Sequence, residues 1–192
     1  MASSFAERFS LARAGDHRAM QELLGRWRPL LRLQARTLLG TQLSARLDPS
    51  DIVQDSLTQA FQDLGDFRGQ TEPEWVAWLR RIVAGHAAKA FRHHTAVKRD
   101  ARRDTALTET FAGKDADQPA DAVIDAEQAL RLADAIESLP EAVREVLVRR
   151  VFHREPFDSI ARTLGTTAGA ARVTWTRALR KLRERLESDG GP

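Results

Sequence analysis

The chain of 192 residues contains no cysteine. This absence excludes disulfide bonds, thiolate nucleophiles and zinc sites with cysteine ligands. The first ten residues, MASSFAERFS, are too polar for a secretory signal, and no apolar run approaches the length of a membrane-spanning helix. We therefore predict a cytoplasmic protein with no membrane insertion.

Catalytic motifs are missing as well. The sequence has neither an HExxH motif nor a glycine-rich phosphate-binding loop. The adjacent His93 and His94 would point about 100° apart on a helix, so they cannot easily share a metal. His17, His86 and His153 have no partners at ligand spacing. We predict no enzymatic activity, no metal and no cofactor.

The charges are unevenly distributed, although the formal net charge is only +3. Residues 76–103 carry eight Lys or Arg and one acid, residues 104–127 carry seven acids and one Lys, and residues 168–186 carry six Lys or Arg and one Glu. Two basic blocks separated by an acidic one are typical of two surfaces that bind a polyanion. The alternative interpretation is three solvated faces with no partner.

The apolar residues recur with helical period, and no useful alternating β-run is present. Helical patterns cover residues 17–39 with a break at Gly40, then a helix capped by Asp48 with Pro49 at its first position and an end at Gly65, then residues 73–93. Six residues of the second helix are predicted to be buried: Ile52, Val53, Leu57, Ala60, Phe61 and Leu64.

The second half of the chain also has helical patterns. SLPE (138–141) predicts a capping box for a helix that continues to Phe152, and Pro156 opens a short helix that Gly165 ends. Residues 96–125 have the composition of a linker. We predict an all-α chain of two small helical domains, residues 1–95 and 126–187, joined by a flexible acidic linker.

The stretch FDSIARTLGTTAGAARVTWTRALRKL (157–182) predicts a helix–turn–helix. Gly165 tolerates the positive φ of the turn, and Ala161 is small enough for two helices to cross closely. Ile160, Leu164, Ala171 and Trp175 are spaced to fill the wedge between them. A threonine, Thr166 or Thr167, caps the second helix. Its exposed residues would enter a DNA major groove: Ala168, Arg172, Thr176, Arg177, Arg180 and Lys181. The alternative is a basic helical hairpin that binds nothing.

These residues and those of the first domain resemble the extracytoplasmic-function (ECF) sigma factors of bacterial RNA polymerase. SDIVQDSLTQAFQDLGDFRGQTEPEWVAWLRRI (50–82) is similar to their region 2, and LPEAVREVLVRRVFHREPFDSIARTLG (139–165) with the following helix is similar to region 4. The resemblance implies that the chain binds core RNA polymerase at the β′ clamp helices and the β flap. It also implies recognition of promoter −35 and −10 elements, promotion of DNA opening, and control by an anti-sigma factor or another regulator.

The resemblance assigns the surface residues to three contacts. Region 4 would bind the −35 element through Thr167, Ala168, Arg172, Thr176, Arg177, Arg180 and Lys181. Region 2 would bind the −10 element through Phe67, Arg68, Arg80, Arg81, Lys89 and Arg92. The core polymerase would contact Asp51, Gln54, Asp55, Gln59 and Gln62. Trp75 and Trp78 could stack on bases, but their spacing with Leu79 and Ile82 favours a core position.

Some positions differ from the usual family pattern. Ala168 replaces an acid, Val173 and Thr174 replace a Ser-Arg pair, and Gly85 and Lys89 replace Asn and Asp. The helix after Asp48 carries Ser50, Ser56 and Thr58 where relatives often have acidic or apolar residues. We hypothesise that phosphorylation of these hydroxyl groups adds the negative charge that polymerase docking prefers.

Two other functions fit parts of the sequence. A helix–turn–helix regulator that acts without polymerase would use the same reading helix, with the N-terminal helices as a dimer or ligand module. A scaffolding protein that binds acidic partners would use the basic surfaces without any dependence on promoter sequence. The basic helix that follows FRG (67–69) and the polar helix before it favour the sigma-factor interpretation.

Overall fold

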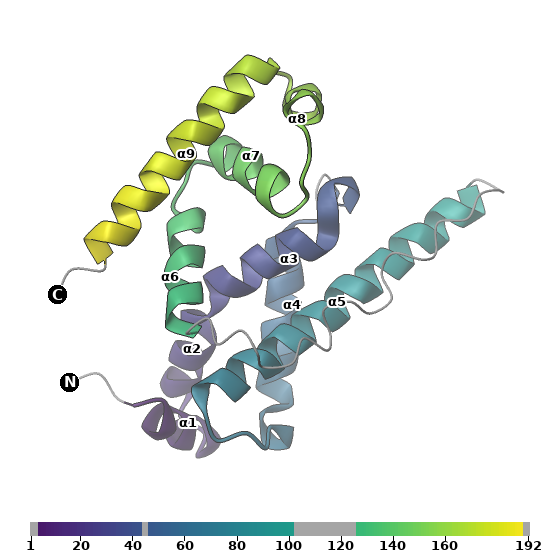
Figure 1. Cartoon of the computed structure of the whole chain (residues 1–192). Helices are drawn as coiled ribbons and strands as arrows, with labels where there is room; N and C mark the ends of the chain where they lie inside the picture. The colour runs from purple at the N-terminus through teal and green to yellow at the C-terminus, as the bar shows by residue number, and fades with distance from the viewer. Residues whose placement is uncertain (1–3, 44–45, 102–125, 190–192) are drawn as a thin grey trace.

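The computed structural model describes residues 4–43, 46–101 and 126–189. Within these ranges the chain is helical and contains no strand, which confirms the all-α prediction. Helices α1–α5 form the N-terminal lobe and α6–α9 form the C-terminal lobe, and the C-terminal end of α5 projects away from both (Figure 1). The predicted linker lies largely in 102–125, outside the described residues.

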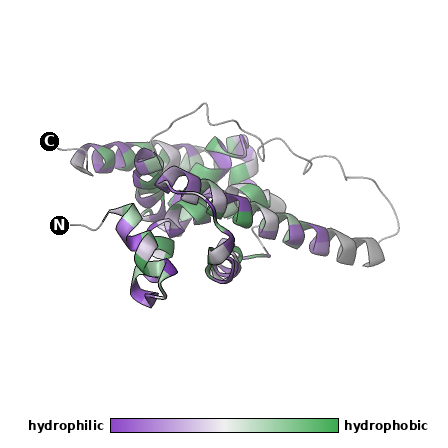
Figure 2. Ribbon diagram, turned by 90° about the horizontal axis from the view of Figure 1, so that it is seen from below, coloured by the Kyte–Doolittle hydropathy of each residue, from purple (hydrophilic) through white to green (hydrophobic). Residues whose placement is uncertain are grey.

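The N-terminal lobe contains five α-helices and one 3-10 turn around a single apolar core. Its largest fully buried side chains include Trp27, Leu31 and Trp75. Hydrophilic and hydrophobic residues alternate in short bands along the helices (Figure 2), as expected where each helix buries one face. The elements are α1 Phe5–Arg13, α2 His17–Arg26, α3 Arg28–Leu43, α4 Pro49–Gln62, η1 Leu64–Asp66 and α5 Glu72–Ala101.

The predicted helix over residues 17–39 is two helices in the structure. Trp27 closes α2, and α3 begins at Arg28 with Pro29 at its second position. Proline has no N–H to donate, so it is tolerated only in the first turn of a helix and interrupts the hydrogen-bond ladder elsewhere. The predicted break at Gly40 is confirmed, since this residue has φ 61° inside α3.

The start of α4 is confirmed, whereas its end differs from the prediction. The Asp48 carboxylate accepts a hydrogen bond from the Ser50 N–H, and this bond is the main cause that lowers the pKa of Asp48. The helix ends at Gln62, before Gly65. The prediction that Phe61 is buried is wrong, because its side chain is 47% exposed and stacks on His17.

The C-terminal lobe contains four helices, with bounds α6 Ala126–Glu137, α7 Glu141–Val151, α8 Phe157–Leu164 and α9 Ala168–Asp189. The capping box predicted at SLPE is wrong. Pro140 occupies the cap position of α7 without a side-chain bond, while the Ser138 hydroxyl donates to the Ala135 carbonyl. Pro156 and Gly165 bound α8 as predicted, and Gly165 has φ 63°.

The two lobes pack against each other through α3, α6 and α7. Leu33 of α3 lies in the apolar cluster of the C-terminal lobe with Ile136, while Leu130 of α6 lies in the N-terminal core. Around these apolar contacts, Arg36 forms ion pairs with three glutamates, Glu137, Glu141 and Glu145, at 3.6, 2.9 and 3.9 Å. Arg26 is paired in the same way with Glu127. The boundary between the lobes therefore combines apolar contacts with ion pairs around them.

None of the helices in the described ranges is both long enough and apolar enough to cross a membrane.

Candidate nucleic-acid interface

Helix α9 presents a basic face from its first turns. Thr167 caps the helix, and its Oγ1 accepts a hydrogen bond from the Ala170 N–H at 3.1 Å. Of the seven residues predicted to contact DNA here, Ala168 is half-buried and the others are exposed: Thr167, Arg172, Thr176, Arg177, Arg180 and Lys181. The structure therefore places the predicted set along one helix, with long cationic side chains that reach solvent.

The opposite face of α9 anchors the helix on α7 and α8. Ala171 lies against Ile160 and Val146, all three are buried, and Leu164 and Trp175 pack around them. The turn is closed by a hydrogen bond from the Thr166 N–H to the Ala161 carbonyl at 2.9 Å. This packing confirms the predicted wedge and fixes the direction in which the basic face points.

The loop between η1 and α5 is held in one conformation by Glu74. Its carboxylate accepts hydrogen bonds from the backbone N–H groups of Gln70 (2.9 Å) and Thr71 (3.0 Å) and from the Thr71 hydroxyl. These bonds, first of all the one from Gln70, lower the pKa of Glu74. Gly69 lies against the Phe67 ring so closely that a Cβ at this position would clash with it.

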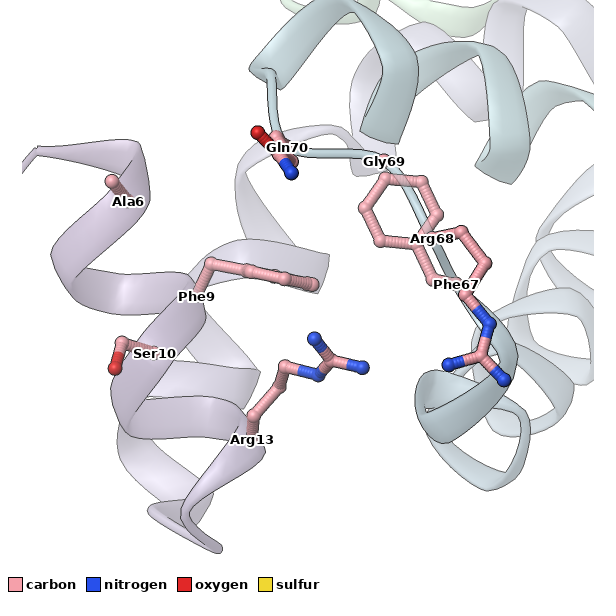
Figure 3. A pocket seen from close by; sticks show the side chains of 8 residues that line it. All are labelled: Ala6, Phe9, Ser10, Arg13, Phe67, Arg68, Gly69 and Gln70. Carbon is pink, nitrogen blue, oxygen red and sulfur yellow. The ribbon is translucent and has the colours of Figure 1, made fainter.

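A cavity of about 350 Å³ separates this loop from α1. The rings of Phe9 and Phe67 contact each other edge to face at 5.4 Å. Arg13 reaches from α1 into the space in front of the loop, and Arg68 lines the loop side (Figure 3). Behind the rings, Phe67 contacts Trp75 and Trp78, each at 5.2 Å between centroids. The cavity thus combines aromatic walls with two guanidinium groups.

The residues predicted to bind DNA in this lobe occupy different environments. Phe67 is only 4% exposed and is available to a ligand only through the cavity that it lines. Trp75 is fully buried, as its spacing favoured. The charged residues of the set are all exposed: Arg68, Arg80, Arg81, Lys89 and Arg92.

The sequence interpretation missed Phe9 and Arg13, which complete the cavity. Both lie on α1, a helix that was not predicted. The signal for α1 is nevertheless present in the sequence, because Ser4 and Glu7 form a capping box with hydrogen bonds in both directions. Recognition of that motif would have predicted α1 itself, although not its position beside the loop, which depends on tertiary packing.

A polar face on α4 carries the predicted docking residues Asp51, Gln54, Asp55, Gln59 and Gln62, all of which are exposed. Two of them are held by neighbouring helices. The Gln54 Oε1 accepts a hydrogen bond from Arg28 at 3.1 Å, and the Gln59 Oε1 lies 2.8 Å from the His86 Nε2.

The hydroxyl residues of the same helix differ in accessibility. Ser56 is 2% exposed, and its Oγ donates to the Ile52 carbonyl at 2.6 Å, so a kinase could not reach it in the folded lobe. Thr58 is exposed, and Ser50 is half-buried. The phosphorylation hypothesis is therefore restricted to these two positions.

No group of three or more His, Asp or Glu side chains that could hold a metal ion is found in the part of the chain that the structure describes. The carboxylate of Glu137 is paired with Arg36 and Arg144, so this cluster is a network of ion pairs at the boundary between the lobes rather than a metal site.

The chain is similar in sequence to proteins of known function. Residues 129–182 match the family described as Sigma-70, region 4. The chain is 30% identical over 177 residues to the ECF RNA polymerase sigma factor SigD of Mycobacterium tuberculosis, an alignment that covers 92% of this chain and 81% of that protein. It is 32% identical over 139 residues to the RNA polymerase sigma factor CarQ of Myxococcus xanthus, covering 70% and 75% of the two chains. A solved structure of CnrH in complex with the cytosolic domain of CnrY aligns over 96% of this chain and 98% of that one, with 22% identity and a TM-score of 0.37.

Proposed function

The chain belongs to the ECF family of RNA polymerase sigma factors, and on this premise we propose which of its surfaces perform each step of promoter recognition. Proteins of this family are transcription initiation factors rather than enzymes. The expected contribution of each surface is therefore binding energy and selectivity, and we propose that the chain carries out no chemical step of its own.

Helix α9 reads the −35 element. Its N-terminal turns carry Arg172, Thr176 and Arg177 outward, while Ala171 and Trp175 hold the helix on α7 and α8. A helix supported in this way fits the major groove, where one well-placed arginine contributes about 1–3 kcal/mol of discrimination for guanine. This supported basic face is the observation that carries the proposal.

The cavity between α1 and the loop receives an unstacked base of the −10 element. Its volume of about 350 Å³ is in the range of pockets that hold small ligands, about 300–1,000 Å³. Arg13 lies over the Phe9 ring, with its Cζ 5.5 Å from the ring centroid. An entering base would take this place on the ring, and Arg13 and Arg68 would offer charge to its phosphate. Stacking of this kind stabilises a bound base by about 1–3 kcal/mol.

The separated strand then continues along α5, where Arg80, Arg81 and Lys89 are exposed. Positive charge along a helix holds a single strand through its phosphates without reading its sequence. Helix α4 supplies the docking face for core polymerase through Asp51, Gln54 and Asp55. An anti-sigma protein that covers this face would compete directly with polymerase.

Reconstitution with purified core RNA polymerase and a genomic promoter library tests the proposal. We expect transcripts from promoters that share a bipartite −35 and −10 motif, and no transcripts from core polymerase alone. Tight and specific DNA binding by the chain alone, without any association with polymerase, would instead support a helix–turn–helix regulator that acts on its own.

A further inference from the structure

Two arginine side chains from different helices converge on a single aromatic ring in the C-terminal lobe. Phe157 is the first residue of α8, and its ring is half-buried against the cluster that supports α9. The Arg150 Cζ of α7 lies 4.8 Å from the centre of this ring, and the Arg172 Cζ of α9 lies 5.6 Å from it. Phe157 therefore connects a predicted DNA-reading arginine to a second arginine that the sequence did not single out.

Neither guanidinium group is neutralised by a carboxylate in the described residues. Arg150 donates from Nη1 to the Glu155 backbone carbonyl at 2.9 Å. The Glu155 carboxylate is already occupied, because it pairs with Arg149 at 3.1 Å and accepts a hydrogen bond from the Ser159 hydroxyl. Two guanidinium groups are thus held on the same ring, and neither forms an ion pair with a carboxylate of the described residues.

The ring explains how this arrangement is maintained. The face of a phenylalanine ring is negative, so it attracts a guanidinium group and restricts the orientations of its long side chain. Like charges held on one ring still repel each other, and an anion that binds Arg150 relieves this repulsion while Arg172 stays free to contact base edges. A DNA phosphate beside the groove that α9 enters has the required charge, and the planar guanidinium of an arginine can donate two parallel hydrogen bonds to its oxygens.

We propose that Phe157 is a positioning residue for promoter recognition, which orients Arg172 toward the base edges of the −35 element and adds Arg150 as a contact to a neighbouring backbone phosphate. This inference rests on the proposed function of α9. The two arginines then have separate roles: Arg172 contributes to sequence discrimination, whereas Arg150 contributes affinity that is independent of sequence and sensitive to salt.

The geometry can be tested without DNA by NMR on the full chain. In the wild-type protein we expect the Nε–H signals of Arg150 and Arg172 to carry ring-current shifts. These shifts should disappear in Phe157→Leu and remain in Phe157→Tyr, which keeps the ring. Phe152→Leu is the matched control, since Phe152 is an exposed aromatic residue at the end of α7 and no arginine of the described residues lies over its ring. Unshifted signals in the wild-type protein would overturn the proposal.

The function is tested with the reconstituted holoenzyme on promoters selected by the wild-type chain, using a panel of −35 variants at several salt concentrations. Phe157→Leu should weaken promoter binding by about two- to five-fold for each lost contact, and it should reduce discrimination among the −35 variants. Phe157→Tyr and Phe152→Leu should match wild type. Arg150→Ala should weaken binding to all variants equally and reduce the salt slope by about 1.

The outcomes separate the inference from the proposed function. If the wild-type holoenzyme does not discriminate among −35 variants, the proposed role of α9 fails, whatever the NMR shows. If the wild type discriminates but folded Phe157→Leu behaves identically, the positioning role is refuted. Since Phe157 is half-buried, Phe157→Leu is first checked for a native melting transition. As a second test, Phe157→Leu is combined with Arg172→Ala, a substitution at an exposed residue, and discrimination among the −35 variants is measured again. In that background Phe157→Leu should no longer change discrimination, and an undiminished effect would contradict the proposal.

Discussion

At the scale of single residues, the loop beside the cavity tolerates almost no added volume at Gly69. A Cβ at this position would overlap the Phe67 ring and would come within 2.9 Å of the Glu74 Cβ. The Phe67 ring cannot move deeper into the core, because it is packed against Phe9, Trp75 and Trp78. A displaced ring would therefore have to move into the cavity. The side-chain arrangement of the cavity therefore depends on the absence of a side chain at its edge.

We predict that Gly69→Ala impairs DNA opening more than promoter binding. The displaced Phe67 ring would obstruct the cavity, whereas the −35 surface on α9 belongs to the other lobe. Permanganate reactivity of the −10 thymines should fall strongly in the reconstituted holoenzyme, and −35-dependent binding should stay near the wild-type level. Gly85→Ala is the control, because a Cβ at Gly85 meets no other atom within 4 Å. Unchanged permanganate reactivity in Gly69→Ala would contradict the proposed base pocket.

His153 predicts a dependence of stability on pH. Its partial burial lowers its pKa below the ordinary value near 6.5, and the neighbouring Glu155 only partly opposes this effect. The unfolded chain therefore takes up the proton first as the pH falls through 6.5, and the free energy of unfolding decreases below that pH. Urea denaturation at pH 7.5 and 5.5 should show a smaller loss of stability in His153→Gln than in wild type. The exposed His93→Gln should retain the wild-type loss.

At the scale of secondary-structure elements, the two ends of α9 have different roles. Arg172 lies near the start of the helix on the Phe157 ring, while Arg180 lies two turns further on and pairs with the exposed Glu184 at 3.7 Å. Exposed pairs of this kind contribute little to the free energy of folding, so Arg180 can leave Glu184 and bind a DNA phosphate with little loss of stability.

We predict that Arg172→Ala relaxes discrimination among −35 variants, whereas Arg180→Ala weakens binding to all of them and reduces its salt dependence. Promoter affinity of the holoenzyme, measured on a panel of −35 substitutions at several salt concentrations, distinguishes the two effects. If the two variants were indistinguishable across the panel, the assignment of base and phosphate contacts would be wrong.

Most elements could be predicted from the sequence wherever a local cause fixes them. Asp48 and Thr167 cap their helices through their own side chains, and Gly165 makes the turn through its backbone conformation. The capping box at Ser138 failed because Pro140 takes the cap position and the serine hydroxyl donates backward to Ala135. The same motif at Ser4 is real and was overlooked.

The positions of the exposed charged residues of the site could be predicted from the sequence, whereas the cavity and the contacts between residues of different helices could not. Helical periodicity places Arg172 and Arg177 on an outward face. It cannot show that Arg13 from α1 lines the same cavity as Arg68, or that Arg150 from α7 lies over the Phe157 ring, because these placements join residues of different elements. Such juxtapositions depend on tertiary packing, which one sequence does not specify by pattern.

At the scale of the whole molecule, Arg36 is the centre of the charged contact between the lobes. Its side chain is 14% exposed and faces Glu137, Glu141 and Glu145, while Arg144 joins the same cluster through Glu137 at 2.7 Å. Removing one partner from a partly buried network of this kind leaves charges without compensation, which costs more than the loss of a surface pair.

We predict that Arg36→Glu separates the lobes in the unbound chain. Because the protein has no native cysteine, cysteines introduced at the exposed Gln21 and Glu187 can carry two labels for distance measurement. The distance distribution should broaden and lengthen in Arg36→Glu and contract again when Glu141→Arg is added. Arg18→Glu is the control, since among the residues that the structure describes Arg18 forms its ion pair within α2, with Glu22. An unchanged distribution in Arg36→Glu would show that the apolar contact alone holds the lobes.

The exchange of leucines between the two cores has a thermodynamic consequence. Leu33 completes the C-terminal cluster and Leu130 completes the N-terminal one, so neither lobe can melt without opening a hole in the other. Calorimetry of the wild-type chain should show one transition in which the van't Hoff and calorimetric enthalpies agree, and Arg36→Glu should divide it into two. A chain whose sequence is organised as two modules would then behave, on heating, as one cooperative unit.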